Sequence, residues 1–177
     1  MRVPDKSSII RFLLWAAVLL WMALIFSLSA QQAAQSSSLS GSTIKTVVSV
    51  THPDFKEWPM EKQNSLIDNY QHAVRKSAHA MAYLVLGALC MTALYQYLIK
   101  GGWRFAAALA ICAGYAVTDE LHQLFVAGRS GQITDVCIDT GGALLGILIV
   151  WLAHWAVKRK AAKDALIRYL KELNITK

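Results

Sequence analysis

Three separate stretches of the sequence carry ionisable side chains at helical spacing. The first has two basic residues, a histidine and a tyrosine on one helical face: Arg75, Lys76, His79 and Tyr83. The second has a tyrosine, two acids and an amide at intervals of three or four residues: Tyr115, Asp119, Glu120 and Gln123. The third has a basic residue between glycines and two acids one turn apart: Arg129, Asp135 and Asp139. Together these groups can transfer protons to and from an anionic ligand.

A histidine next to a carboxylate, such as His79 next to Glu120, can act as an oriented general base or acid. The predicted catalytic residues are His79, Glu120, Asp119 and Asp135. A guanidinium on a glycine-flanked loop suits a bidentate grip on phosphate or carboxylate. The predicted substrate-binding residues are Arg129, Lys76, Gln123 and Tyr83. The alternative is a network of ion pairs that holds the helix ends together without chemistry.

No metal site and no cofactor are predicted. The residue types of a metal site are present at His79, Asp119, Glu120 and Asp135. However, the sequence lacks an established ligand spacing such as HExxH, and three nearby basic residues oppose a cation. It also has no glycine-rich phosphate loop and no dinucleotide fingerprint.

Four apolar stretches must position these residues. Of the 177 residues, 55% are hydrophobic and 16% are charged, whereas soluble domains have about a quarter charged residues. A hydrocarbon core about 30 Å thick needs roughly 20 apolar residues per helix. Four windows qualify, at about residues 9–28, 77–98, 105–120 and 135–157. We predict an all-α fold, in which one membrane domain over residues 1–177 forms a four-helix bundle.

The distribution of basic residues orients the predicted spans. Of the 18 lysines and arginines, 12 fall on the side that holds both termini, many of them in the tail at residues 158–177. The positive-inside rule places both termini in the cytoplasm. Because this asymmetry accounts for most of the net charge of +7, we predict membrane lipids as partners and no nucleic acid. The alternative for the first span is a cleaved signal peptide.

Residues 30–76 form the predicted extracytoplasmic segment. Residues 31–43 are rich in serine and glutamine, which is typical of a linker. From Trp58 onward, apolar residues recur at helical spacing and predict an amphipathic helix, either on the outer membrane surface or on the outer mouth of the bundle. In the fourth span, Gly142 and Gly146 form a GxxxG pattern, which predicts close packing within the bundle or a homodimer.

The order of these motifs resembles the VanZ-like family of bacterial integral membrane proteins. The resemblance covers most of residues 9–157 and is carried by RKSAHAMAY at residues 75–83, DELHQLF at 119–125, Gly128-Arg129 and Asp135-Val136. The family pattern maps onto Lys76, His79, Tyr83, Asp119, Glu120, Gln123, Arg129, Asp135 and Gly142. Two positions depart from it, because Ala127 replaces a proline and Asp139 stands where asparagine is common.

The resemblance implies an envelope protein of the bacterial cell membrane that contributes to resistance against teicoplanin and related glycopeptides. Together with the polar residues, it predicts an outward-facing pocket that binds or modifies a lipid-linked precursor or another anionic envelope molecule. The alternative is a non-enzymatic scaffold or binding protein whose charges form a structural network. A small transporter is disfavoured, because the sequence has neither an inverted repeat nor a broken-helix signal.

Overall fold

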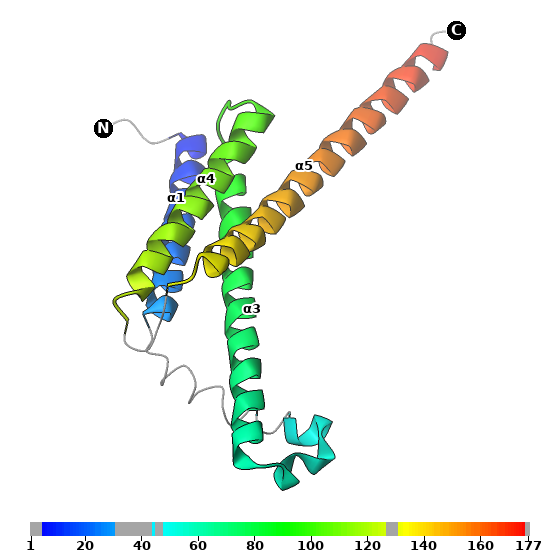
Figure 1. The fold of residues 1–177 in the computed structure, drawn as a ribbon. Helices are drawn as coiled ribbons and strands as arrows, with labels where there is room; N and C mark the ends of the chain where they lie inside the picture. The colour runs from blue at the N-terminus through cyan, green and yellow to red at the C-terminus, as the bar shows by residue number, and fades with distance from the viewer. Residues whose placement is uncertain (1–4, 31–43, 45–47, 127–130, 176–177) are drawn as a thin grey trace.

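The computed structural model describes residues 5–30, 44, 48–126 and 131–175 (Figure 1). These residues form four long helices, α1 (Lys6–Ser29), α3 (Met60–Leu94), α4 (Gly101–Gln123) and α5 (Ile133–Ile175), and a 3-10 helix, η1 (Pro53–Glu57). No strand occurs among them, so the predicted all-α class is confirmed. The predicted linker at residues 31–43 lies outside the described residues.

Helix α3 is the centre of the arrangement (Figure 1). It contacts α1, α4 and α5, and its most extensive contact is with α5. The core between the helices consists of buried side chains such as Leu86, Met91, Cys112 and Ile147. By length and apolar composition, α1, α3 and α5 can each cross a membrane. Many large apolar side chains on their outer faces are exposed, which suits helices that face lipid.

Helix α3 joins two elements that the sequence pattern separates. The predicted amphipathic helix from Trp58 and the predicted span from Ser77 continue into one another, within a helix of 35 residues that is about 52 Å long. Residues 60–86 contain neither proline nor glycine, so nothing interrupts the backbone hydrogen bonds. The N-terminal half of α3 therefore projects beyond the other helices (Figure 1). A small apolar cluster covers one side of this half: Ile44, Val48, Phe55 and Ile67.

Helix α5 likewise joins the predicted fourth span to the basic tail. It has 43 residues and is about 65 Å long, roughly twice the thickness of a hydrocarbon core. The sequence has no proline or glycine after Gly146, so the helix continues through the tail. Residues 155–173 are exposed and extend away from α1, α3 and α4 (Figure 1).

Glycines allow α3 and α5 to approach at backbone distance. A Cβ atom added to Gly142 or Gly146 of α5 would collide with the carbonyl oxygen of Ala80 or Leu84 of α3, respectively. On α3, a Cβ atom at Gly87 would collide with the carbonyl oxygen of Ala143. The GxxxG pattern therefore serves close packing within the chain. The homodimer through the same glycines stays a prediction.

Helix α1 is attached through side-chain hydrogen bonds to backbone carbonyls. The indole N–H of Trp21 donates to the carbonyl oxygen of Ala82 on α3 at 2.8 Å. The hydroxyl of Tyr115 on α4 donates to the carbonyl oxygen of Met22 at 2.6 Å. Because both acceptors are backbone groups, these bonds fix the position of α1 along the helices it contacts.

Candidate functional site

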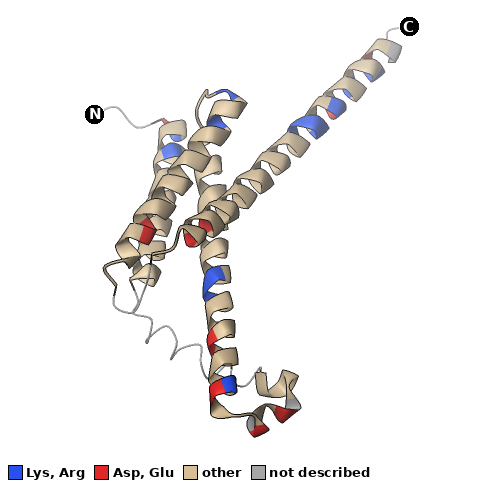
Figure 2. Ribbon diagram, in the orientation of Figure 1, with Lys and Arg blue, Asp and Glu red and all other residues tan. Residues whose placement is uncertain are grey.

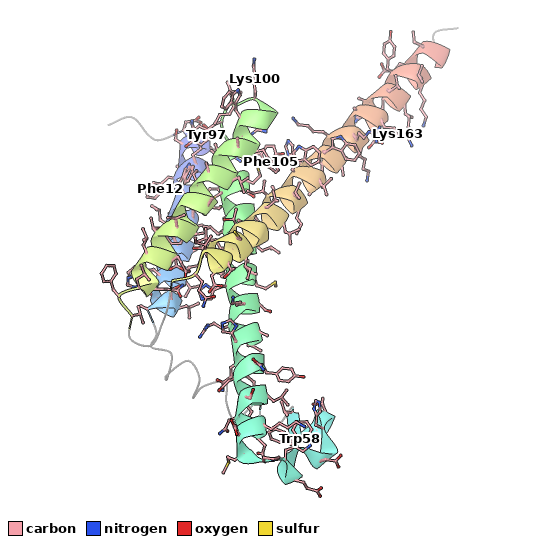
Figure 3. All side chains as sticks on the ribbon, viewed as in Figure 1. Phe12, Trp58, Tyr97, Lys100, Phe105 and Lys163 are labelled. Atoms are coloured by element: carbon pink, nitrogen blue, oxygen red, sulfur yellow. The ribbon has the colours of Figure 1, made fainter. Side chains whose placement is uncertain are left out.

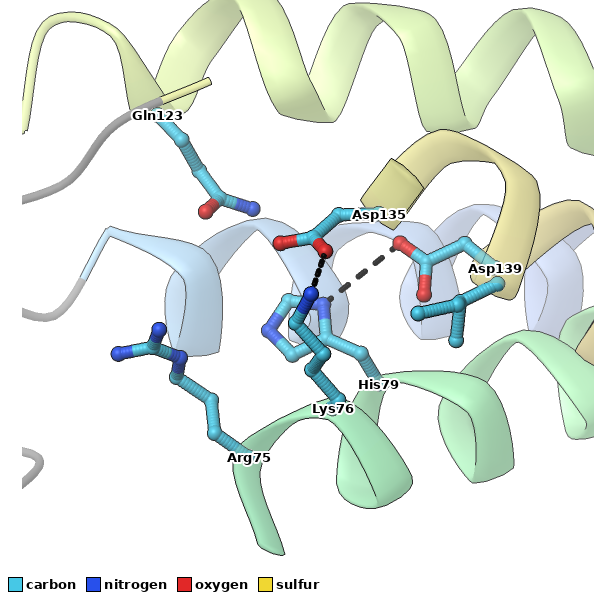
Figure 4. Close-up of a pocket in the computed structure, with 7 residues that line it drawn as sticks. Arg75, Lys76, His79, Gln123, Asp135 and Asp139 are labelled. Atoms are coloured by element: carbon cyan, nitrogen blue, oxygen red, sulfur yellow. Dashed lines mark ion pairs between the residues drawn. The ribbon is translucent and has the colours of Figure 1, made fainter. Parts of the chain in front are cut away.

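A small polar cavity lies where α3, α4 and α5 meet (Figure 4). Its lining residues are Arg75, Lys76, His79, Gln123, Asp135, Ile138 and Asp139. The cavity has a volume of about 10 Å³, which is room for roughly one water-sized particle. The structure thus brings together four residues predicted for the site, although they lie on three helices: Lys76, His79, Gln123 and Asp135.

An ion pair between α3 and α5 forms one side of the cavity. Lys76 Nζ lies 2.7 Å from Asp135 Oδ1, and about a quarter of each side chain is exposed (Figure 4). Asp135 also lies in the first turn of α5, where the helix dipole favours a carboxylate. The predicted substrate-binding lysine and the predicted catalytic aspartate are therefore partners of one another.

The carboxylate that approaches His79 is Asp139, which lies one helical turn after Asp135. His79 Nδ1 lies 3.7 Å from Asp139 Oδ2 (Figure 4). The prediction that His79 lies next to Glu120 is therefore wrong. In the structure, Glu120 accepts a hydrogen bond from the backbone N–H of Gln132 and so ties α4 to the start of α5. Glu120 follows Asp119 by one residue, about 100° around the helix, and therefore faces a different neighbour.

Asp119 lies close to His79 and Asp139 of the cavity lining and is 2% exposed. One of its oxygens, Oδ2, accepts hydrogen bonds from Ser29 Oγ at 2.9 Å and from Gln123 Nε2 at 3.4 Å. The other oxygen, Oδ1, is buried and has no hydrogen-bond partner among the described residues. Ser29 is the last residue of α1, so this carboxylate joins the ends of α1 and α4.

Tyr83 lies one turn further along α3 than His79, in the helix core rather than in the cavity lining. Its side chain is fully buried, and its hydroxyl has no hydrogen-bond partner among the described residues. Its electrostatic neighbours include Asp119 and Asp139. The tyrosine predicted to bind substrate is therefore placed next to the two buried carboxylates.

An apolar groove lies beside the polar cavity, between α4 and α5. It has a volume of about 310 Å³. Its lining residues are Val117, Glu120, Leu121, Leu124, Gly131, Gln132, Ile133 and Val136. The groove and the cavity are lined by the same turns of α4 and α5, because Val136 follows Asp135 and Glu120 precedes Gln123 by three residues.

Comparison with known proteins decides the family. Residues 14–154 match the family model described as VanZ/LLP1, which is most of the chain. The chain belongs to the VanZ/LLP1 family. No curated protein and no solved structure matches it. Membership of VanZ/LLP1 and the three apolar helices together indicate a membrane protein.

The residues that carry the VanZ-like pattern have different places in the structure. Lys76, His79, Gln123 and Asp135 line the cavity. Tyr83 and Asp119 are buried and do not line it, and Gly142 packs against Ala80 of α3. Glu120 faces the groove. The predicted ligand-binding Arg129 and its neighbours at residues 127–130 lie outside the described residues.

Four residues of the site were not among the predicted catalytic or substrate-binding residues: Arg75, Ile138, Asp139 and Ser29. Asp139 was predicted to lie near the acids but received no role, although its spacing of four from Asp135 places both on one face of α5. Ser29 gave no signal, because a serine at the end of an apolar helix is common and its partner Asp119 is 90 residues away.

Proposed function

We propose that this VanZ/LLP1 protein crosses the bacterial cell membrane four times, with both termini in the cytoplasm. Figure 2 supports this topology, because Lys and Arg gather at the N-terminal end of α1, at the α3–α4 connection and along the tail of α5. These segments lie at the same end of the helices. Under the positive-inside rule that end faces the cytoplasm, and the polar cavity then faces outward.

The outward cavity and the apolar groove together form a site for an anionic lipid-linked envelope molecule. The observation that carries this proposal is their adjacency: an amphiphile needs a polar site for its headgroup and an apolar surface for its chain. Arg75 and Lys76 supply positive charge at the cavity, and the groove offers Leu121, Leu124 and Val136 to a hydrocarbon chain. In this proposal Arg129 contributes a further contact to the headgroup.

The proposal includes a role in teicoplanin resistance. A protein that binds or modifies a lipid-linked precursor at the outer surface would change how strongly a lipophilic glycopeptide binds to that surface. In the enzymatic version, His79 transfers the proton and the Asp139 carboxylate orients its ring. Glu120, which faces the groove, is the second acid–base group.

A second candidate is a non-enzymatic scaffold in which the charges only hold the helices together. The observations that favour it are the close Lys76–Asp135 pair and the small volume of the cavity. In this version the protein has no specific ligand site. Removal of a charge then lowers the free energy of unfolding and leaves ligand binding unchanged.

The first experiment measures teicoplanin susceptibility of a bacterial host with and without expression of the chain. We expect expression to lower susceptibility. Equal susceptibility at confirmed expression would remove the resistance role.

The second experiment compares Arg75→Ala with Lys62→Ala on the same helix. Arg75 lines the cavity and forms no ion pair with the described residues, whereas Lys62 lies over the ring of Trp58 far along α3. Native mass spectrometry of each protein in mixed anionic and zwitterionic lipid measures bound anionic lipid. We expect Arg75→Ala to lose anionic lipid at an unchanged melting temperature and Lys62→Ala to retain it. A lower melting temperature with unchanged lipid binding would favour the scaffold.

A further inference from the structure

Three side chains from three helices converge beside the polar cavity. They are His79 of α3, Asp119 of α4 and Asp139 of α5, and one nitrogen or oxygen of each lies within 4.8 Å of the others. Asp119 and Asp139 are each 2% exposed, and His79 is the partly exposed member. Imidazole and carboxylate are ligands of divalent transition metals.

Of the two basic residues that line the cavity, Lys76 is engaged in an ion pair, whereas Arg75 forms none with the described residues. Lys76, the lysine of the cavity, pairs with Asp135 at 2.7 Å. Among the described residues, the ion-pair partner of Asp139 is His79, at 3.7 Å, which is longer than a hydrogen bond. Two buried carboxylates therefore face one imidazole, and buried charges persist mainly when they are paired or coordinate metals.

Unused acceptor atoms point to a ligand. Oδ1 of Asp119 and Oδ1 of Asp139 are both buried, and neither has a hydrogen-bond partner among the described residues. The hydroxyl of Tyr83, fully buried beside both carboxylates, has none either. Such groups cost free energy unless something binds them.

We propose that, in place of the proton-transfer role of the enzymatic version, His79 binds a divalent transition-metal ion together with Asp119 and Asp139, with Zn²⁺ as the first candidate. Two carboxylates balance the charge of such an ion, and three protein ligands leave a coordination position open. Ligand atoms about 2.1 Å from a tetrahedral ion lie about 3.4 Å apart, near the 3.7 Å between His79 Nδ1 and Asp139 Oδ2. The adjoining cavity, which His79 and Asp139 line, has a volume of about 10 Å³, room for roughly one water.

The surroundings of Asp119 match those of a metal ligand. Ser29 and Gln123 donate to its Oδ2, which fixes the carboxylate and leaves Oδ1 available. Hydrogen bonds of this kind orient the ligands of metal sites. The sequence predicted no metal, because it lacks an established ligand spacing and basic residues oppose a cation. In the structure Lys76 pairs with Asp135, and Asp139 joins His79 and Asp119 as a third possible ligand.

The test measures metal content of the purified full-length chain. The protein is stripped with a chelator, offered Zn²⁺, Mn²⁺ or Mg²⁺ alone, freed of excess ion and analysed by elemental mass spectrometry. We expect about one Zn²⁺ or Mn²⁺ per chain and a higher melting temperature with the ion bound. A content below about one ion per ten chains with each of the three metals would overturn the proposal. The two buried carboxylates would then be explained by a proton that they share.

Variants locate the ion. We expect Asp139→Asn and His79→Gln to weaken Zn²⁺ affinity by at least about 100-fold, more than the loss of an orienting group costs. Glu120→Gln is the matched control, since it removes a carboxylate from the same end of α4 outside the cluster, and it should keep its full metal content. Full metal content in folded Asp139→Asn protein would overturn the proposal. Since the wild-type measurement needs no variant, misfolding of one variant does not affect it.

Discussion

The backbone of Gly142 on α5 packs directly against the carbonyl oxygen of Ala80 on α3. Ala80 follows His79, and Gly142 lies three residues after Asp139. The contact between Ala80 and Gly142 therefore sets how closely the side chains of His79 and Asp139 approach each other. Any Cβ atom at position 142 would collide with the backbone of α3. The glycine therefore positions the carboxylates of α5 against the basic residues of α3.

The substitution Gly142→Val should separate α3 from α5. Because the obstacle is backbone, which cannot move aside as a side chain can, we expect a loss of about 1–3 kcal/mol in the free energy of unfolding. Thermal unfolding of the purified protein in detergent measures this. Gly141→Ala is the control, since a Cβ atom there meets nothing within 4 Å and alanine favours a helix. Equal melting temperatures for the two variants would contradict the role of Gly142.

The Lys76–Asp135 pair should stabilise the protein by a modest, measurable coupling. About a quarter of each side chain is exposed, so we expect about 1 kcal/mol between them, at the upper end of the range for exposed pairs. A double-mutant cycle with Lys76→Met and Asp135→Asn measures this coupling by denaturation in detergent. Strictly additive effects would mean that the pair contributes nothing to stability, which would weaken the scaffold alternative.

Ser29→Ala should loosen the contact between α1 and α4. The substitution removes a hydrogen bond to the buried Asp119, and we expect a cost of about 1–3 kcal/mol in unfolding free energy. Ser27→Ala is the matched control, because Ser27 is exposed and donates only to Ala23 of its own helix. A cost at position 27 as large as that at position 29 would show that the bond to Asp119 is not what matters.

Much of the fold was predictable from the sequence because helices in lipid need long apolar runs. The run at residues 9–28 matches α1 within a few residues at each end. The unbroken lengths of α3 and α5 were missed, since hydropathy changes near residues 76 and 157 while helix continuity depends on the lack of proline and glycine there. The hydropathy pattern thus marks where a helix passes from an apolar to a polar environment, and it does not mark where the helix ends.

The site was predicted in outline but not in its pairing. Helical spacing placed Lys76 and His79 on one face, and the structure shows them on one cavity. Whether His79 meets Glu120 or Asp139 depends on the rotation of α4 and α5 about their axes, and the glycine contacts with α3 set that of α5. Rotation of this kind arises from tertiary packing, so no local sequence signal reports it.

The proposed topology can be tested by labelling single cysteines from one side of the membrane. The exposed Cys137 is first replaced by serine, and the buried Cys90 and Cys112 stay in place because burial protects them from a membrane-impermeant maleimide. Met60→Cys then reports on the N-terminal end of α3 and Tyr169→Cys on the tail of α5, both at exposed positions. We expect intact cells to label the first variant only.

Permeabilised cells supply the control, since both variants should then react to the same extent. The physical reason for the expected difference is the tail of α5, whose lysines and arginines resist translocation and hold that end in the cytoplasm. Labelling of Tyr169→Cys in intact cells, with Met60→Cys protected, would show that the protein has the opposite orientation in the membrane. The cavity around His79 would then face the cytoplasm, out of reach of molecules on the outer surface.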